Sequence, residues 1–509
     1  MSRRAFHVVQ SSLLASIAVL VTAVGLSAGQ GPRTPMVADA LRWPTERPPR
    51  PLSAKPVKFP PYEIRTLPNG LKVVLVSQNE QPIVSARMLI RAGASQDPKG
   101  KEGLAMLTSA LLDQGTATRT AAQIAEEIDF MGGLLGTGAG TDLSFVNTVS
   151  MSDGLGPALD LMSDVVRRPA FDEAEIERQR QQALSSLTVA ADDPDTVASQ
   201  VIDRLVFGFH PYGMPAGGTV ASLGTLTRQD FVTYHKAWFV PNNALIAIVG
   251  DVSPDAAFAQ VQRVFGDWTQ AEVPTVAPME PPPPVKRLIV IDKPGSVQTE
   301  IRAGHLAFAR KHPDHLVMDQ VVKILGGEGG NRLQQVLRTQ KALTYGASAD
   351  LDAYKQTGAI IAETDTRTEA TGEAVRTVVD EFSRLQRERV YEGELEGAQA
   401  FLAGSFPLSI ESPDAIATRV LNQLFYDLPL EDLPAYPERV RSVTVDDVQR
   451  AAKTWLKPAQ LSVVLVGDAD RFIKELAGAG FSNIERIPIE QVDLTSADLR
   501  RASGRGPQH

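Results

Sequence analysis

The apolar residues of the chain follow two spacings, one typical of helices and one typical of strands. Leu104, Leu107 and Leu111 stand at i, i+3 and i+7, which predicts an amphipathic helix within residues 100–116. Further patterns predict strands over residues 71–76, 83–90 and 142–151, and helices over residues 120–130, 156–166 and 171–187, with Thr120 as an N-cap. Long helices among antiparallel-looking strands predict an α+β fold in which helices cover a mainly antiparallel sheet.

The second half of the chain repeats the pattern of the first. Residues 227–251 read TRQDFVTYHKAWFVPNNALIAIVGD, and residues 444–468 read TVDDVQRAAKTWLKPAQLSVVLVGD. At a constant offset of 217 residues, 8 of these 25 positions are identical, among them Trp238/Trp455 and Pro241/Pro458. Each segment predicts a helix, a proline stop and a buried strand. The length of the repeat indicates a duplicated domain, because solenoid periods are about 20–50 residues.

Two proline-rich stretches divide the chain. They predict linkers over residues 31–58 and 274–286, because proline runs favour extended polyproline II and cannot continue a helix or a sheet. The linkers bracket two homologous domains, predicted over residues 59–273 and 287–493, and a tail over residues 494–509 follows.

The N-terminus has the order of segments found in an export signal. Arg3 and Arg4 precede an uncharged apolar run, Leu13 to Ala28, which ends in small residues. This order predicts a signal peptide over residues 1–30 and an exported, periplasmic protein. The alternative is an uncleaved membrane anchor, although the run is short for a spanning helix. The pair Arg3-Arg4 also fits a twin-arginine signal. Because such a short pattern can arise by chance, we expect the general secretory route.

Composition narrows the possible chemistry. The chain has 43% hydrophobic and 22% charged residues, as soluble globular proteins do. Its formal net charge of -9 does not support nucleic-acid binding. The absence of cysteine excludes thiol nucleophiles, disulfides, iron–sulfur clusters and cysteine-type zinc sites.

Several short motifs together resemble one family. They are Leu67-Pro68-Asn69-Gly70-Leu71, Arg91-Ala92-Gly93, the segment 100–116, Gly132-Gly133, His210-Pro211-Tyr212-Gly213 and the helix–proline–strand–Gly-Asp ends of both halves. On these motifs the chain resembles the pitrilysin family of zinc peptidases, which includes insulin-degrading enzyme and the mitochondrial processing peptidase. The resemblance covers nearly all of residues 60–490 and implies two α+β domains that form a clamshell.

The resemblance also implies that the zinc site is lost. Active members carry His-x-x-Glu-His on the helix that corresponds to residues 100–116, and the matching positions are Met106, Ser109 and Ala110. The third ligand of the family is a glutamate about 75 residues further on, where this chain has Ser185 and Ser186. None of these side chains supplies the imidazole or carboxylate groups that the chemistry needs. We therefore expect no metal and no catalytic residue in this chain.

One pair of residues matches a substrate-binding feature of the family. Arg338 and Tyr345, seven residues apart, match an arginine–tyrosine pair that faces the zinc and binds the peptide backbone in active members. Spacing alone favours another interpretation, in which Arg338 lies on a helix surface and Tyr345 in the core. Residues 132–140 correspond to an edge strand that pairs with peptide in the family, but their glycines weaken a strand, and we do not expect peptide binding there.

Other candidates favour structural roles. His312-Pro313-Asp314-His315 reads as a solvated helix start rather than a metal site. His210 and His235 read as packing or surface residues. The glycine run 326–330 lacks the lysine of a phosphate-binding loop and reads as a hinge before Asn331, an N-cap.

The sequence as a whole predicts the catalytically silent subunit of a heteromeric zinc-dependent endopeptidase. A homologous partner with an intact motif would hold the zinc, and an unfolded peptide would be the substrate. This chain would supply Arg338, Tyr345 and half of the chamber wall. The alternatives are a peptide-binding or scaffold protein without peptidase activity, and a free-standing enzyme with another mechanism.

Overall fold

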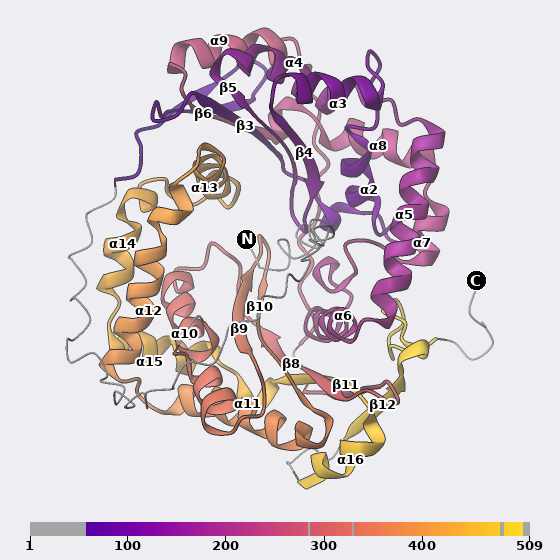
Figure 1. The fold of residues 1–509 in the computed structure, drawn as a ribbon, viewed down its shortest axis with the longest axis vertical. Coiled ribbons are helices and arrows are strands. Elements are labelled where there is room, and N and C mark those ends of the chain that lie inside the picture. The colour runs from indigo at the N-terminus through magenta and orange to yellow at the C-terminus, as the bar shows by residue number, and fades with distance from the viewer. Residues whose placement is uncertain (1–57, 284–285, 328–329, 479–482, 502–509) are drawn as a thin grey trace, which may run out of the picture. The chain divides into compact units, whose positions relative to one another are not determined.

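A computed structural model describes residues 58–283, 286–327, 330–478 and 483–501. The predicted signal peptide, the first proline-rich linker up to residue 57 and the last eight residues of the predicted tail lie outside these ranges. The described chain contains two six-stranded sheets with helices packed against them (Figure 1). Within these ranges no helix is both long enough and apolar enough to cross a bilayer.

The first sheet belongs to the first half of the chain. Its strands are β1 (Glu63–Thr66), β2 (Lys72–Ser77), β3 (Ile83–Ile90), β4 (Leu134–Ala139), β5 (Ser144–Met151) and β6 (Ala244–Gly250), in the order β1-β2-β6-β3-β5-β4. Only β2 and β6 pair in parallel, and the other neighbours are antiparallel. The predicted α+β class with mainly antiparallel pairing is confirmed.

The second sheet repeats this arrangement. Its strands are β7 (Leu288–Asp292), β8 (Gln298–Leu306), β9 (Ala347–Ala353), β10 (Gly358–Arg367), β11 (Ser462–Gly467) and β12 (Ile484–Pro488), in the order β12-β7-β11-β8-β10-β9. The strands β2-β6-β3-β5-β4 and β7-β11-β8-β10-β9 correspond one to one. The helices before β6 and β11, α8 (Arg228–Trp238) and α15 (Val445–Trp455), both begin with a Thr–Asp capping box.

Helices from the same half cover one face of each sheet. On the first sheet these helices include α2 (Leu104–Leu111), α3 (Ala121–Phe130), α4 (Leu155–Arg167), α5 (Glu173–Asp192), α7 (Val220–Thr225), α8 and α9 (Pro254–Phe265). On the second they include α10 (His315–Gly326), α11 (Thr371–Arg387), α12 (Glu392–Ser405), α15 and α16 (Ala469–Gly478), while α14 (Asp432–Ser442) packs against α12. Leu104, Leu107 and Leu111 all lie in the first core, which confirms the predicted helical face.

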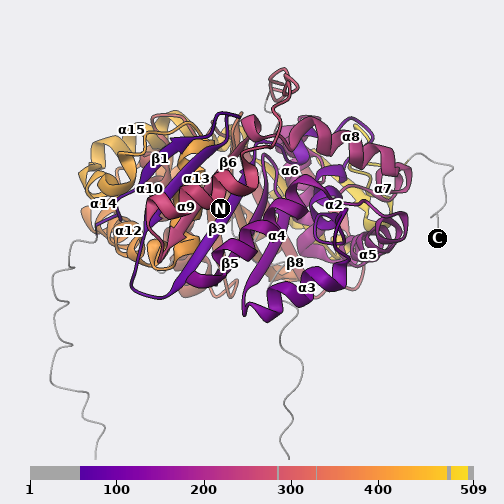
Figure 2. The same ribbon diagram turned by 90° about the horizontal axis from the view of Figure 1, so that it is seen from above.

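The opposite face of each sheet is covered by a helix from the other half. Helix α13 (Pro413–Phe425) packs on β3 and β6 of the first sheet, beside buried Val74, Leu89 and Leu245. Helix α6 (Pro194–Phe207) packs in the same way on β8 and β11 of the second sheet (Figure 1). Figure 2 shows α13 beside β6 from above. Because apolar residues line both faces of both sheets, each half depends on a helix of the other to bury its core.

Cations from two separate segments bind the C-terminal end of α13. Arg91, which follows β3, donates to the carbonyls of Phe425 and Leu424 at 3.2 and 3.1 Å. Lys355, in the turn between β9 and β10, donates to the carbonyl of Phe425 at 3.1 Å. Positive charge at the carbonyl end of a helix is favourable, because the last carbonyls carry partial negative charge.

The glycine-rich segment forms a regular edge strand, although the sequence predicts a weakened one. Strand β4 pairs with β5 over its full length. A Cβ on Gly136 would lie 2.7 Å from Oδ1 of Asn147, and one on Gly138 would lie 2.7 Å from the ring of Phe145. The glycines therefore make room for side chains of the neighbouring strand.

Candidate functional site

The helix that corresponds to the zinc helix is well anchored. Its N-terminus begins after Gly103, which has φ 96°. The carboxylate of Asp97 accepts hydrogen bonds from the amides of Gly103 and Ala105, each at 2.8 Å. Burial raises the pKa of Asp97 to about 7, against the lowering effect of these hydrogen bonds. Asp97 therefore caps the N-terminus of α2.

The positions that would hold zinc carry no ligand chemistry. On α2, Met106 is 37% exposed, while the hydroxyl of Ser109 is buried and has no hydrogen-bond partner among the described residues. On α5, Ser185 and Ser186 are exposed, and the Ser185 hydroxyl donates to the carbonyl of Gln181 at 2.9 Å. A thioether and three hydroxyls are not the donor set that zinc prefers. In the part of the chain that the structure describes, no three His, Asp or Glu side chains gather as a metal site.

Polar side chains connect α2 and α5 instead. Arg178 of α5 donates to the side chain of Gln114, just beyond α2, and also pairs with Glu175 at 2.8 Å. The Gln114 amide in turn donates to the carboxylate of Asp113 at 2.6 Å. One hydrogen bond, from Arg178 to Gln114, therefore joins α5 to the segment just beyond α2.

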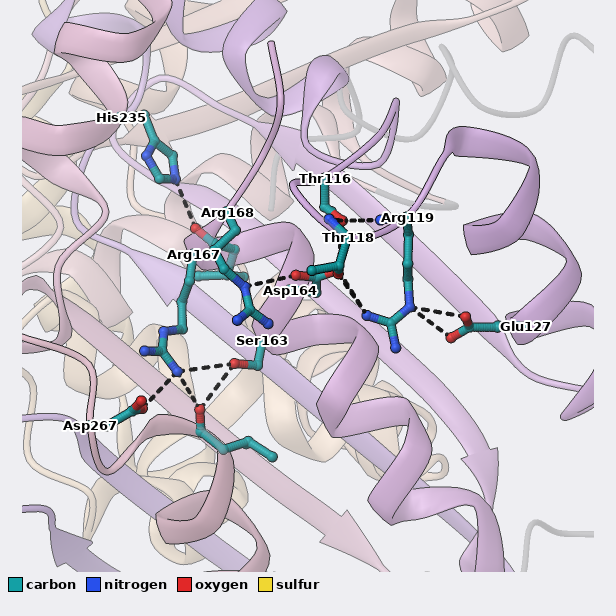
Figure 3. A network of polar contacts seen from close by, with 12 residues as sticks. Thr116, Thr118, Arg119, Glu127, Ser163, Asp164, Arg167, Arg168, His235 and Asp267 are labelled. Carbon is teal, nitrogen blue, oxygen red and sulfur yellow. Dashed lines mark hydrogen bonds and ion pairs between the residues drawn. The ribbon is translucent and has the colours of Figure 1, made fainter. Parts of the chain in front are cut away.

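A buried carboxylate fixes the loop that follows α2 (Figure 3). Asp164 of α4 accepts from Thr116 at 2.6 Å, Thr118 at 2.7 Å, Arg119 at 2.8 Å and Arg168 at 2.8 Å. Burial acts to raise the pKa of Asp164, but these hydrogen bonds and charges outweigh it and lower the pKa. Asp164 is therefore a charged structural anchor. Sequence reasoning missed it, since a single acid in an apolar helix carries no sign of its distant partners.

Three further contacts in Figure 3 hold the end of α4. Arg167 and Ser163 both donate to the carbonyl of Val264, at 2.7 and 3.0 Å. The ring of His235 contacts the carbonyl of Val166 at 2.8 Å, and burial lowers the pKa of His235 to about 4. His235 is thus a buried, neutral packing residue, in agreement with its predicted role.

His210 is also buried. Its Nδ1 accepts from the amide of Tyr212 at 3.1 Å, so the histidine shapes the turn of the His-Pro-Tyr-Gly run.

The region around His312 differs from the predicted solvated helix start. Asp314 pairs with Arg450 through bonds of 2.7 and 3.1 Å and accepts from the indole of Trp455 at 2.8 Å. His312 packs against Trp455, with 4.7 Å between ring centroids. The expectation of a solvated Asp314 is wrong, because α15 packs over the start of α10 and supplies both partners.

Arg338 and Tyr345 lie in the second half, beside the start of the edge strand β9. Arg338 is in a π-helix, η5 (Gln334–Gln340). Its side chain is exposed, and Tyr345 is 85% exposed. The interpretation that places Tyr345 in the core is therefore wrong. The remaining candidate positions lie in the first half, on α2 and α5.

The turn between Arg338 and Tyr345 has a defined geometry. The amide of Leu343 donates to the carbonyl of Leu337 at 2.8 Å, and the amide of Ala342 donates to the carbonyl of Arg338 at 3.1 Å. Both leucines are buried, and Ala342 has φ 50°. The left-handed residue and the apolar contact are those of a Schellman helix end, and each hydrogen bond spans one residue more, as at the end of a π-helix.

Strand β10 holds the residues on either side of Tyr345. Thr366 donates to the carbonyl of Leu343 at 2.7 Å, and Thr364 donates to the carbonyl of Gly346 at 2.9 Å. The Thr344 hydroxyl also donates to the carbonyl of Gly346 at 2.8 Å. The backbone that carries Tyr345 is thus fixed, while its phenol ring is exposed.

The first glycine of the run 326–330 lies at the C-terminal end of α10. A Cβ on Gly326 would lie 2.2 Å from the amide nitrogen of Ala349, so only glycine allows α10 to end this close to β9. Asn331 accepts from the amide of Gln334 at 2.8 Å, which confirms it as an N-cap.

Two repeats of one sheet-and-helix unit, with exchanged helices and a helix at the zinc-motif position, define a protein of zinc-peptidase architecture. The chain belongs to peptidase family M16. The family model "Insulinase (Peptidase family M16)" matches residues 72–220, and the model "Peptidase M16 inactive domain" matches residues 225–402.

Individual relatives agree with this assignment. An uncharacterised zinc protease of Mycobacterium tuberculosis is 26% identical over 406 residues, which cover 79% of this chain and 92% of that protein. The crystal structure of a peptidase M16 inactive domain from Pseudomonas fluorescens superimposes with a TM-score of 0.76 and 28% identity over 80% of this chain and 98% of that one. A protease from Helicobacter pylori shares the fold, with a TM-score of 0.75 and 22% identity over 80% of this chain and 99% of that one.

Proposed function

We propose that this chain is a catalytically silent subunit of a heteromeric zinc-dependent endopeptidase. One observation carries the proposal: the zinc-motif positions on α2 hold Met106, Ser109 and Ala110, whereas Arg338 and Tyr345 remain exposed on a fixed turn. A chain that has lost the metal ligands but keeps exposed substrate-binding groups is suited to complete another chain's active site.

The two side chains have complementary chemistry. The guanidinium of Arg338 can donate two hydrogen bonds to a peptide carbonyl and so orient the backbone. The phenol of Tyr345 can donate to the oxygen that becomes negatively charged during amide hydrolysis. A zinc ion on the partner subunit would supply the Lewis acid and the activated water.

The proposed partner is a homologous subunit with an intact His-x-x-Glu-His motif, and the proposed substrate is an unfolded peptide held between the two subunits. The experiment is a mild purification of the native protein, followed by identification of the chains that elute with it. The proposal expects a second chain with the zinc motif and about one zinc per pair of subunits. If no such partner elutes with this chain at any step of the preparation, a peptide-binding or scaffold role without peptidase activity is favoured.

We propose further that the protein is exported to the periplasm. The support is the order of charged, apolar and small residues over residues 1–30. Terminal sequencing of native protein should find a start near Gly29 or Gln30, whereas an intact Met1 would favour a membrane anchor.

A further inference from the structure

A partly buried ion pair lies at the start of the helix that carries Arg338. Arg332, whose side chain is 5% exposed, donates from Nε to one carboxylate oxygen of Glu394 at 2.7 Å and from a terminal nitrogen to the other at 3.0 Å. Such a two-bond arrangement fixes both side chains in orientation as well as in distance. Arg332 stands two residues before η5, so the pair joins this helix to α12.

Glu394 is itself held in place. It accepts a hydrogen bond from the amide of Tyr391 at 2.9 Å, at the first turn of α12. Burial acts to raise the pKa of Glu394, but the hydrogen bonds and the charge of Arg332 outweigh it, and the pKa is lowered. The carboxylate is therefore charged at neutral pH and attached to a rigid helix.

The other end of η5 is held by a second helix. Lys341 donates to the hydroxyl of Thr377 and pairs with Glu373, each at 3.0 Å, and both partners lie on α11. Between the two ends, Leu333 and Leu337 are fully buried. The segment is thus attached to the protein at both ends and along one face, while Arg338 points away from the core.

A helix of this kind needs outside support. π-Helical turns are rare in proteins, and those that form are often found at functional sites. The left-handed Ala342 adds a backbone conformation that residues other than glycine rarely adopt. In an α-helix, a shift of one residue turns a side chain by about 100°, which would move Arg338 off the exposed side and bring Leu337 out of the core. Contacts that fix the register therefore fix where Arg338 points.

We propose that Arg332 and Glu394 are positioning residues for Arg338, acting through the register of η5. The inference rests on the proposed substrate-binding role of Arg338 and deepens it, since it names the residues that orient the guanidinium. Neither member of the pair meets the substrate. Their effect on peptide binding passes through Arg338 alone, and it should vanish once that side chain is removed.

The test is a double-mutant cycle in the complex reconstituted with the zinc-bearing partner. Glu394→Gln keeps the size of the side chain but removes the charge and one of the two acceptors. We expect it to raise KM for an unfolded peptide about tenfold with little change in kcat, in the same direction as Arg338→Ala. In the Arg338→Ala background, Glu394→Gln should cause no further rise.

A matched control separates positioning from stability. Arg287 and Glu485 form a similar two-bond pair, at 2.9 and 2.8 Å, which joins β12 to the start of β7. Glu485→Gln should lower Tm by a similar amount and leave KM unchanged. If Glu394→Gln prevents folding, Glu394→Asp serves in its place, because it keeps the charge and shortens the reach, and the same pattern is expected.

Three outcomes would overturn the inference. In the first, Glu394→Gln, or Glu394→Asp in its place, leaves KM unchanged although Arg338→Ala raises it. In the second, the substitution raises KM equally with and without the Arg338 side chain. In the third, Arg338→Ala itself has wild-type kinetics, and then the proposed function of Arg338 fails together with the positioning role.

Discussion

The hydroxyl of Tyr212 donates to the carboxylate of Asp142 at 2.7 Å, and the hydroxyl oxygen of Tyr212 also accepts from the amide of Gln356 at 3.1 Å. Asp142 also accepts from the amide of Lys355 at 2.9 Å. Tyr212 and Asp142 belong to the first half, whereas Gln356 and Lys355 form the turn between β9 and β10 in the second. This relationship therefore joins the two halves at the edge strand that begins beside Tyr345.

Tyr212→Phe tests the strength of this junction. The substitution removes one donor from a buried carboxylate and the acceptor of a backbone amide. We expect it to lower the free energy of unfolding by about 1–3 kcal/mol, as measured by urea denaturation. Tyr391→Phe is the matched control, because Tyr391 is 75% exposed and its change should stay within about 0.5 kcal/mol. Equal effects of the two substitutions would show that the Tyr212 hydroxyl does not hold the junction.

Buried His305 makes stability fall with acid. Burial lowers its pKa to about 4, while its Nδ1 contacts the carbonyl of Leu306 at 2.9 Å and its Nε2 accepts from the amide of Lys457 at 3.2 Å. The native ring is thus neutral, whereas an unfolded histidine takes up a proton below a pKa of about 6.5. Above pH 6.5 the buried neutral ring therefore does not reduce the free energy of unfolding. As the pH falls to about 4, the free energy of unfolding decreases by about 3 kcal/mol.

His305→Gln is the variant that checks this dependence. The free energy of unfolding of each protein should be measured between pH 7 and pH 4. Its slope against pH should differ between the two proteins by an amount that corresponds to the uptake of up to one proton. Parallel curves over this range would show that His305 does not contribute to acid sensitivity.

The exchange of α6 and α13 predicts that neither half folds alone. A fragment over residues 58–273 lacks α13 and exposes Val74, Leu89 and Leu245 on its sheet. We expect no cooperative unfolding of this fragment, and recovery of cooperative unfolding when a fragment over residues 286–501 is added. A fragment 58–273 that unfolds at the midpoint of the full chain would contradict this expectation.

The side chains at the zinc-motif positions predict that the isolated chain binds no stoichiometric zinc. Elemental analysis should find far less than one zinc per chain, and addition of a chelator should leave Tm unchanged. A content of about one zinc per chain, lost together with a fall in Tm, would contradict the assignment of Met106, Ser109 and Ala110 as an empty motif.

Local patterns made most of the elements predictable. Thr120 accepts from the amide of Gln123 at the start of α3, and β3 spans the predicted residues 83–90. Capping and apolar periodicity act within one turn or one strand, so the sequence shows them directly. The family resemblance then supplied the arrangement of the two repeats.

Long-range relationships were not predictable in this way. The apolar face of α13 shows that the helix packs, but it does not show that it packs on the sheet of the other half. The partners of Asp164 lie 45 to 48 residues away in the chain, apart from Arg168. The sequence around Tyr345 does not show whether the ring is exposed or buried. The turn at Ala342 decides where the ring points.

The most direct test of the account is peptide cleavage by the complex reconstituted with Tyr345→Phe. This substitution keeps the ring and removes only the hydroxyl, and the 85% exposure of Tyr345 makes an effect on folding small. We expect an intact complex in which kcat falls on the order of a hundredfold, because a donor to the developing oxyanion is lost. Wild-type turnover of the Tyr345→Phe complex would contradict a substrate-binding role of Tyr345.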